Sequence, residues 1–358
     1  MAIHIRELTI DQFKGLKNIS LRKLGDINVI LGDNNVGKTS ILELLLCAHE
    51  PASLGNIRNA FRGNGVLSTT SFDGMLGLFP VDNDLKIRYR FTTQKGENDI
   101  VICGKIDSNQ VEVSEIYRLN GYGKIDENSN IDANRLVDAK CLRIDISING
   151  QIMAHYDIFD FLRRTQDDSV SIEFYPSLYV PPASTVQEFV NLSAVLERPE
   201  MQEKLIAILK AYDDSISSIQ AIKSRYNVEY KVVSNKHKVA VPISYYGDGM
   251  KKAIELFSAA VFISGGILLI DEFETSIHTS AMTDTYRRLI EIAKDLDVQL
   301  FMTTHSKEAL EKLIALDVLD DIDFKVHTIF NEDGKHLVRT LDLQEARKAT
   351  TQWGMDLR

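Results

Sequence analysis

The N-terminal part of the chain combines strand-like and helix-like patterns of hydrophobic residues. Residues 3–10 and 17–24 alternate in polarity, which predicts two strands. Residues 27–31 form a short β-branched run that is typical of a buried strand, and an apolar stretch follows from Lys38 to His49. The pattern therefore predicts a strand, a glycine turn and a helix in immediate succession.

The middle of the chain, residues 72–175, has a different pattern. Short alternating segments predict strands, and Asn149-Gly150 is a strong signal for a two-residue hairpin turn. The polar span 120–138 predicts a mobile loop. We expect an antiparallel, β-rich insertion with strands at 85–92, 99–106, 110–118, 141–148 and 151–157.

Helices and strands alternate after this insertion. Thr185 with Glu188 three residues later resembles a capping box, at the start of helices that we expect to fill 185–224. Strands return at 227–243, and the alternation continues to a strand pair near 325–340. This order is typical of an α/β fold.

Composition and charge narrow the class of protein. The 358 residues are 44% hydrophobic and 26% charged, which supplies ample material for a core and excludes disorder as the main state. The formal net charge of −10 is unlike that of proteins that coat nucleic acid, so any contact with nucleic acid must come from a local patch.

The longest apolar stretch and the cysteines bear on where the protein is located. The apolar stretch from Leu256 to Ile270 is too short and too interrupted to span a bilayer, and it predicts a buried helix followed by a buried strand. The cysteines are far apart and lack metal-ligand spacing: Cys47, Cys103 and Cys141. We expect a cytoplasmic protein that has no contact with a membrane.

Residues 32–39, GDNNVGKT, have the pattern of a phosphate-binding loop, between the predicted strand and the predicted helix. Glycines let the backbone curl so that N–H groups face phosphates, and the helix N-terminus adds positive potential. Lys38 is expected to contact the β- and γ-phosphates, and Thr39 to hold Mg²⁺. The residues expected at the nucleotide are Asp33, Asn34, Asn35, Val36, Gly37, Lys38, Thr39 and Ser40.

Residues 267–272, ILLIDE, join a buried strand to two carboxylates. An acid at such a strand end holds Mg²⁺ in phosphoryl-transfer sites, and we assign this role to Asp271. If the strand continues, Glu272 points the other way and would polarise the attacking water. Acids also end strands without a catalytic role, but the phosphate-binding loop favours the catalytic interpretation.

Residues 300–306, LFMTTHS, form another apolar strand, which ends at His305. A helix lies between Glu272 and this strand, so both strand ends would lie on the same edge of a parallel sheet. There His305 would reach the γ-phosphate or its water, and we count His305, Glu272 and Lys38 as the candidate catalytic residues. For His278 we favour a structural or interface role.

Together these motifs resemble the ABC-type ATPases of the SMC/RecF/OLD branch, most closely the small standalone AAA-like bacterial ATPases. The resemblance rests on Phe13-Lys14-Gly15, INVILGDNNVGKTSILE, IDEFETSIHTS and MTTHS, and it covers residues 1–65 and 176–358. It implies an α/β ABC-ATPase head, a P-loop NTPase with a mixed sheet, an antiparallel β subdomain and a helical subdomain. It also implies a nucleotide contact from Lys14. The domains expected are two head halves, 1–71 and 227–358, a β-rich insertion, 72–175, and a helical subdomain, 176–226.

The resemblance also implies a signature motif and a D-loop. The best signature match is Gly247-Asp248-Gly249 with Lys251, before an apolar helix whose N-terminus would bind a phosphate. Gly247 stands where many members have serine, and Lys251 would compensate for the missing hydroxyl. A plain glycine-rich helix start is the other interpretation. Ser276 ends the D-loop match. We do not assign the Q-loop glutamine, and Arg62-Gly63 and Phe79 flank the region where the resemblance would place it.

The implied mechanism is ATP hydrolysis by paired heads, with ATP and Mg²⁺ as cofactors. Two heads would sandwich two ATP molecules head to tail, which gives a homodimer or a higher homo-oligomer. Fifty-three residues follow His305, too few for a further domain of about 100 residues. We therefore expect no TOPRIM nuclease domain, and a separate effector protein as a partner.

Two cellular roles are open. The resemblance favours the sensor or regulatory ATPase of a bacterial anti-phage defence system, which would control a nuclease or toxin effector. The alternative is a RecF- or SMC-like DNA repair or maintenance ATPase with a basic groove. The basic residues that would line this groove are also explained by an ordinary solvent-exposed charged face. Those residues are Arg163, Arg164, Lys223, Arg225, Lys231, Lys236 and Lys238. The atypical signature disfavours a transporter ATPase, and the intact Glu272 disfavours a non-catalytic scaffold.

Overall fold

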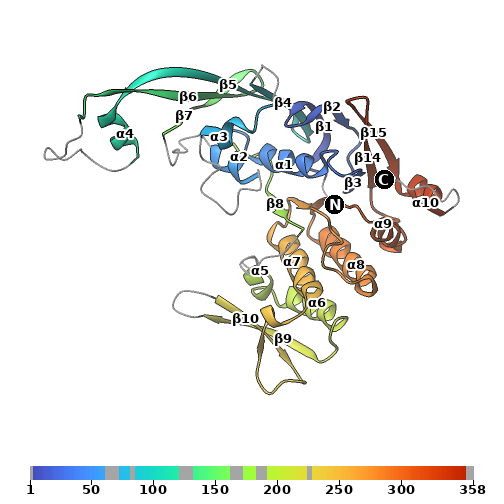
Figure 1. Cartoon of the computed structure of the whole chain (residues 1–358). Helices are drawn as coiled ribbons and strands as arrows, with labels where there is room; N and C mark the ends of the chain where they lie inside the picture. Colours follow the sequence, from blue (N-terminus) through green and yellow to red (C-terminus); the bar gives the residue numbers. More distant parts are fainter. Residues whose placement is uncertain are drawn as a thin grey trace. The chain divides into compact units, whose positions relative to one another are not determined.

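The computed structural model describes residues 3–60, 72–80, 85–120, 132–161, 172–182, 192–223 and 228–351 (Figure 1). The chain divides into two compact units, each of which is described by itself. The parallel-sheet unit comprises Met1–Arg6, Leu21–Leu42 and Tyr175–Arg358. The antiparallel-sheet unit comprises Glu7–Ser20 and Glu43–Phe174.

A six-stranded sheet in the order β15-β14-β3-β13-β12-β8 is the centre of the parallel-sheet unit. Its inner strands, β3 (Ile27–Gly32), β13 (Gln299–Thr303) and β12 (Ile267–Ile270), are buried at every position, as in parallel sheets that are covered on both faces. Strands β8 (Ser177–Val180) and β14 (Phe324–Glu332) pair with them in parallel, and β15 (Lys335–Asp342) pairs with β14 in antiparallel. The carboxyl ends of β3, β13 and β12 therefore lie along one edge.

Helices surround this sheet and share its apolar core. Helix α7 (Asp248–Phe262) is buried along most of its length and packs against α5 (Leu192–Leu196), α6 (Pro199–Lys210) and α8 (Thr279–Asp295) (Figure 1). The other helical elements are α1 (Lys38–His49), which begins in this unit, α9 (Lys307–Ile314), α10 (Leu343–Thr351) and the short 3-10 turns η2 (Ile243–Tyr245) and η3 (Asp317–Leu319). A small antiparallel sheet of β9 (Ile216–Lys223), β10 (Val228–Ser234) and β11 (Val241–Pro242) packs beside α6.

The antiparallel-sheet unit is built on a second six-stranded sheet, in the order β2-β1-β4-β5-β6-β7. Its strands are β1 (Ile5–Phe13), β2 (Leu16–Leu21), β4 (Lys86–Thr93), β5 (Gly96–Glu112), β6 (Leu136–Ile148) and β7 (Gln151–Phe159). Its helices are α2 (Leu54–Ala60), α3 (Phe72–Leu76) and α4 (Val113–Leu119), and α4 lies at the end of the long β5–β6 ribbon (Figure 1).

Most predicted elements are confirmed. The strand over 27–31, the helix from Lys38 to His49, the buried helix and strand around 256–270, and the terminal strand pair are all present. Asn149 and Gly150 have φ angles of 52° and 80° and form the predicted hairpin turn between β6 and β7.

Two predicted elements are wrong. Residues 110–118 are not a separate strand, because β5 continues to Glu112 and α4 follows. Residues 216–223, predicted as helix, form β9, because pairing with β10 overrides the local pattern. The capping box at Thr185 lies outside the described residues. The predicted domain boundaries stay predictions.

None of the helices in the described ranges is long and apolar enough to cross a membrane.

Candidate active site

The loop between β3 and α1 curls through left-handed backbone conformations. Gly32, Asn35 and Gly37 have φ angles of 143°, 64° and 99°. A Cβ atom at position 32 would lie 2.5 Å from the carbonyl oxygen of Ile329, so both the conformation and the space require glycine there. The sequence therefore places glycine where the turn against β14 is tightest.

The same loop keeps its backbone accessible. Val36 is buried and anchors the loop, whereas Asp33, Asn34 and Asn35 are exposed. Helix α1 begins at Lys38, and the N–H groups of a first helical turn have no acceptor within the helix. Residues 33–40 thus form one continuous turn and helix start, which suits an anionic ligand.

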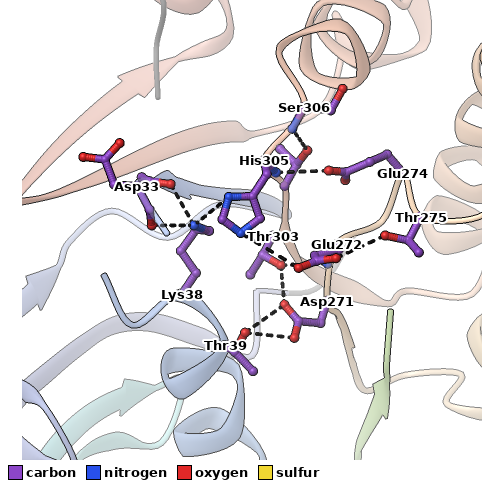
Figure 2. A network of polar contacts seen from close by, with 12 residues as sticks. Asp33, Lys38, Thr39, Asp271, Glu272, Glu274, Thr275, Thr303, His305 and Ser306 are labelled. Carbon is purple, nitrogen blue, oxygen red and sulfur yellow. Dashed lines mark hydrogen bonds and ion pairs between the residues drawn. The ribbon is translucent and has the colours of Figure 1, made fainter. Parts of the chain in front are cut away.

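The buried ammonium of Lys38 folds back over this loop (Figure 2). Its Nζ donates to the carbonyl oxygens of Gly32 (2.7 Å) and Asp33 (2.9 Å), and lies 3.3 Å from Nδ1 of His305. An ammonium has three donors, so these acceptors use all of them. Burial lowers the pKa of Lys38, and nearby carboxylates, first among them Asp271, oppose that shift. A phosphate would therefore have to displace at least one of these acceptors to bind Lys38.

Hydroxyl groups from three elements converge on the buried carboxylate of Asp271, the first residue after β12. The Thr303 hydroxyl of β13 donates to Oδ1 (2.5 Å), and the Tyr179 hydroxyl of β8 donates to Oδ2 (3.0 Å). The Thr39 hydroxyl of α1 lies 2.9 Å from Oδ2 and 3.2 Å from Oδ1. These donors fix the orientation of the carboxylate beside Thr39.

Glu272 does not continue the strand, so the alternation expected for it is wrong. Its φ of 46° places it in a left-handed turn, a conformation that is uncommon for residues other than glycine. Its main-chain N–H donates to the Thr303 hydroxyl (2.8 Å), and its carboxylate accepts from the Thr275 hydroxyl (3.2 Å). The turn leaves this side chain 40% exposed, with Oε1 3.9 Å from Nε2 of His305.

His305 lies between the lysine and the glutamate (Figure 2). An ammonium only donates, so the contact with Lys38 makes Nδ1 the acceptor and places the ring proton on Nε2, toward Glu272. The main-chain N–H of His305 donates to Oε1 of Glu274 (3.0 Å). Lys38, His305 and Glu272 therefore lie in a row at the carboxyl edge of the parallel sheet.

The side-chain oxygen atoms of Thr39 and Asp271 are suitable ligands for Mg²⁺, because they are hard oxygen atoms that lie close together. Among the residues that the structure describes, no group of three or more His, Cys, Asp or Glu side chains is arranged to hold a metal ion. A cation beside Thr39 would therefore need further oxygen ligands from a phosphate and from water, which is the usual arrangement of Mg²⁺ with nucleotides.

Comparisons with known proteins agree with this geometry. Residues 27–311 match the family described as "AAA domain, putative AbiEii toxin, Type IV TA system". The chain belongs to this family. It is also 26% identical over 345 residues to a Helicobacter pylori protein named ATP/GTP phosphatase, and the match covers 90% of each chain. The membership in an AAA-domain family identifies the chain as an ATP-hydrolysing enzyme.

A solved structure titled as an SMC head bound to the C-winged helix domain of ScpA is similar in fold to this AAA-domain protein. The match covers 97% of this chain and 100% of that one, with a TM-score of 0.50 and 13% identity. At this identity the likeness concerns the fold alone, and it confirms the predicted α/β fold with a mixed sheet, similar to that of an SMC head.

The signature-like segment forms the N-terminus of α7. Gly247 is the N-cap, and the Lys251 ammonium is paired with Asp248 at 2.6 Å. Gly249 lies against the turn after β12, where a Cβ atom would come within 3.0 Å of the carbonyl oxygen of Ser276. Glycine at 249 thus has a packing reason of its own, and a phosphate contact from this segment stays a prediction.

A cavity of about 350 Å³ lies beside this helix start. It is lined by Tyr212, Asp213, Tyr246, Gly247, Gly249, Met250, Ser276 and His278. His278 caps α8, since its Nδ1 accepts from the N–H of Ser280 (3.3 Å), and this agrees with a structural role. The turn over 271–278 therefore presents Glu272 to His305 at one end and Ser276 to the cavity at the other.

Lys14 belongs to the antiparallel-sheet unit, in the turn between β1 and β2. Its ammonium is paired with the carboxylate of Glu43 at 2.6 Å. Its contact with a nucleotide stays a prediction. Of the two markers for the Q-loop, Arg62-Gly63 lies outside the described residues, and Phe79 is buried in the antiparallel-sheet unit.

The basic residues of the DNA alternative are partly neutralised. Lys231 is paired with Glu229 (3.1 Å), and Lys236 is paired with Asp213 (2.7 Å). Lys223 and Lys238 are exposed. Arg163, Arg164 and Arg225 lie outside the described residues. The basic residues that the structure describes therefore give little support to the alternative role in DNA binding.

Sequence reasoning missed the partners that orient the site: Thr303, Tyr179 and the carboxylate of Glu274. Thr303 stands in the quoted MTTHS, and its place at a strand end beside ILLIDE was a usable signal. Tyr179 lies in a four-residue strand, and only the pairing of β8 with β12 brings it to Asp271.

Proposed function

We propose that this ATPase uses Glu272 to polarise the water that attacks the γ-phosphate. The observation that carries the proposal is the row of Lys38, His305 and Glu272 beside Asp271 at one sheet edge. Lys38 and the loop N–H groups would bind the phosphates, and the half-exposed Glu272 carboxylate would accept the proton of the water. His305 would use its Nε2–H to orient Glu272 or the transferred phosphate.

Thr39 and Asp271 would hold Mg²⁺ in this site. The ion supplies positive charge to the phosphates when it is bound. The residues of the chain that surround these two ligands keep them in place: Thr303 and Tyr179 bond the carboxylate, and α1 carries Thr39 at its first turn.

We further propose that two copies join around the nucleotide, so that the assembly is a homodimer or a higher homo-oligomer. The glycine-containing start of α7 supports this, because Gly247 and Gly249 line a cavity, and the N–H groups of a helix start could bind the phosphate that a second copy holds. Lys251 would exchange Asp248 for that phosphate, and Ser276 would lie next to it.

The cellular role that we propose is that of the sensor or regulatory ATPase of a bacterial anti-phage system, controlling a separate nuclease or toxin. The family description, which names a toxin of a toxin–antitoxin system, supports a defence setting. The acidic net charge of −10 suits a protein partner at least as well as DNA.

Light scattering on Glu272→Gln, with and without ATP and Mg²⁺, tests the assembly. We expect ATP to double the mass of the particle or raise it further, because the variant binds ATP but does not complete hydrolysis. A particle mass that ATP leaves unchanged at every protein concentration would contradict the dimer. Addition of a short DNA duplex separates the two roles, since a DNA-dependent shift that weakens steeply with salt would favour the repair alternative.

A further inference from the structure

The two strands that flank β12 each supply one hydroxyl to Asp271. On one side, Met302 of β13 pairs with Ile270, so Thr303 follows directly beside Asp271. On the other side, Tyr179 of β8 pairs with Leu269, two residues before Asp271. Residues two apart share a face of the sheet and are roughly 6.6 Å apart along the strand, a length that a phenol side chain bridges. The hydroxyl of Tyr179 therefore reaches Oδ2 of Asp271 from a different strand.

The carboxyl end of β8 is fixed by two further hydrogen bonds. The carbonyl oxygen of Val180 accepts from the N–H of Asp271 (3.0 Å), and that of Pro181 accepts from Nζ of Lys252 (2.6 Å). Lys252 of α7 is fully buried, and it is paired with Glu255 at 3.0 Å. Buried charges are costly unless they are fully bonded, and an apolar residue would fill the same space more cheaply. The position of the Pro181 carbonyl gives this buried lysine a role beyond packing.

We propose that Tyr179 is a positioning residue that holds Asp271 for Mg²⁺, and that the buried Lys252–Glu255 pair keeps Tyr179 in place. This inference rests on the proposed function. Thr39 would be shared between Asp271 and the metal, whereas Thr303 and Tyr179 bond the carboxylate from the two neighbouring strands. Hydrogen-bond partners of metal ligands set metal affinity, and their loss typically costs ten- to a hundredfold.

Tyr179→Phe tests the hydroxyl, because the ring and its packing remain. The probe is a fluorescent, non-hydrolysable ATP analogue, whose affinity for the full chain is measured with and without MgCl₂. We expect the Mg²⁺ concentration at half effect to rise about tenfold or more. The affinity without Mg²⁺ and the melting temperature should stay close to those of the parent. Tyr230→Phe on β10 is the matched control, since it removes a hydroxyl that bonds Ser193 in the same unit, and it should leave the Mg²⁺ response unchanged.

The double variant Lys252→Met/Glu255→Gln tests the support for β8 without leaving a buried charge unpaired. It should shift the Mg²⁺ response in the same direction as Tyr179→Phe, by a smaller factor, even if its melting temperature also changes. An unchanged Mg²⁺ midpoint in Tyr179→Phe would overturn the inference. So would an equal loss of affinity with and without Mg²⁺, which is the result of a merely structural role. A parent protein whose nucleotide binding ignores Mg²⁺ would overturn the proposed metal site as well.

Discussion

The two sheets of this protein use charged residues in different ways. In the antiparallel sheet, Arg88 pairs with Asp99 (2.9 Å) and Arg143 with Asp157 (3.0 Å), and each of these side chains is 30–39% exposed. At the carboxyl ends of the parallel strands, by contrast, Lys38 and Asp271 are buried within the candidate site. The first arrangement consists of partly solvent-exposed ion pairs, whereas the second belongs to the candidate active site.

Strand direction explains the difference. Parallel strands end at the same edge, so the residues after β3, β12 and β13 meet there although they are far apart in the sequence. Antiparallel strands end at alternate edges, and their charged side chains face one another across neighbouring strands instead. The energetic consequences of this contrast can be measured.

The largest effect on stability is expected from Lys252→Met. The substitution removes the ammonium that is paired with the buried carboxylate of Glu255, so the free energy of unfolding should fall by about 3–5 kcal/mol. Urea denaturation measures this change. A loss below about 1 kcal/mol would contradict the idea that buried pairs in the parallel-sheet unit differ from surface pairs.

Lys38→Ala should have the next largest effect, on nucleotide binding and turnover. It removes a desolvated cation from the phosphate-binding loop, so kcat/KM for ATP should fall by about a hundredfold or more, and ATP binding should be abolished. Titration calorimetry measures ATP binding, and a phosphate-release assay measures kcat/KM. Arg88→Ala in the antiparallel sheet is the control, and ATP binding that survives in Lys38→Ala would refute the assigned role.

A pH dependence is expected from His327, which is buried on β14 and whose Nε2 lies 3.3 Å from Asn28 Oδ1. Burial lowers its pKa from an ordinary 6.5 to about 4, so the folded state favours the neutral ring. Its contribution is present above pH 6.5 and is lost as the pH falls toward 4, because only the unfolded chain takes up the proton. The change is on the order of 3 kcal/mol. Urea titrations at pH 7 and pH 4.5 measure this change. His327→Gln should lose less free energy of unfolding between the two pH values than the parent does, and an equal loss in both proteins would contradict the prediction.

The smallest effect is expected from Arg143→Met in the antiparallel sheet. Its pairs with Asp157 and Asp107 are partly exposed, so the free energy of unfolding should change far less than it does in Lys252→Met. The same urea experiment compares it directly with Lys252→Met. Similar losses in both variants would erase the distinction between the two sheets.

The sequence was sufficient to predict those parts of the site whose chemistry is local. The candidate phosphate-binding loop lies in consecutive residues, and Asp271, Glu272 and His305 each follow an apolar run that predicts a buried strand. The common edge of these strands followed from strand direction alone.

Pairing between distant strands was not readable in the same way. Tyr179 reaches Asp271 only because β8 pairs with β12, and residues 216–223 form a strand only because β10 lies beside them. The left-handed turn at Glu272 also escaped prediction, because the run ILLIDE gives no sign that the strand stops at Ile270. Such features depend on tertiary contacts, which local patterns do not encode.

The most direct test of the catalytic site is the rate of ATP hydrolysis by Glu272→Gln beside Glu291→Gln. The two glutamates are almost equally exposed, at 40% and 39%, but only Glu272 faces His305 at the sheet edge. We expect Glu272→Gln to lower kcat by about a hundredfold or more while ATP still binds, and Glu291→Gln to match the parent. Hydrolysis by Glu272→Gln at the rate of the parent would contradict the assignment of the catalytic carboxylate.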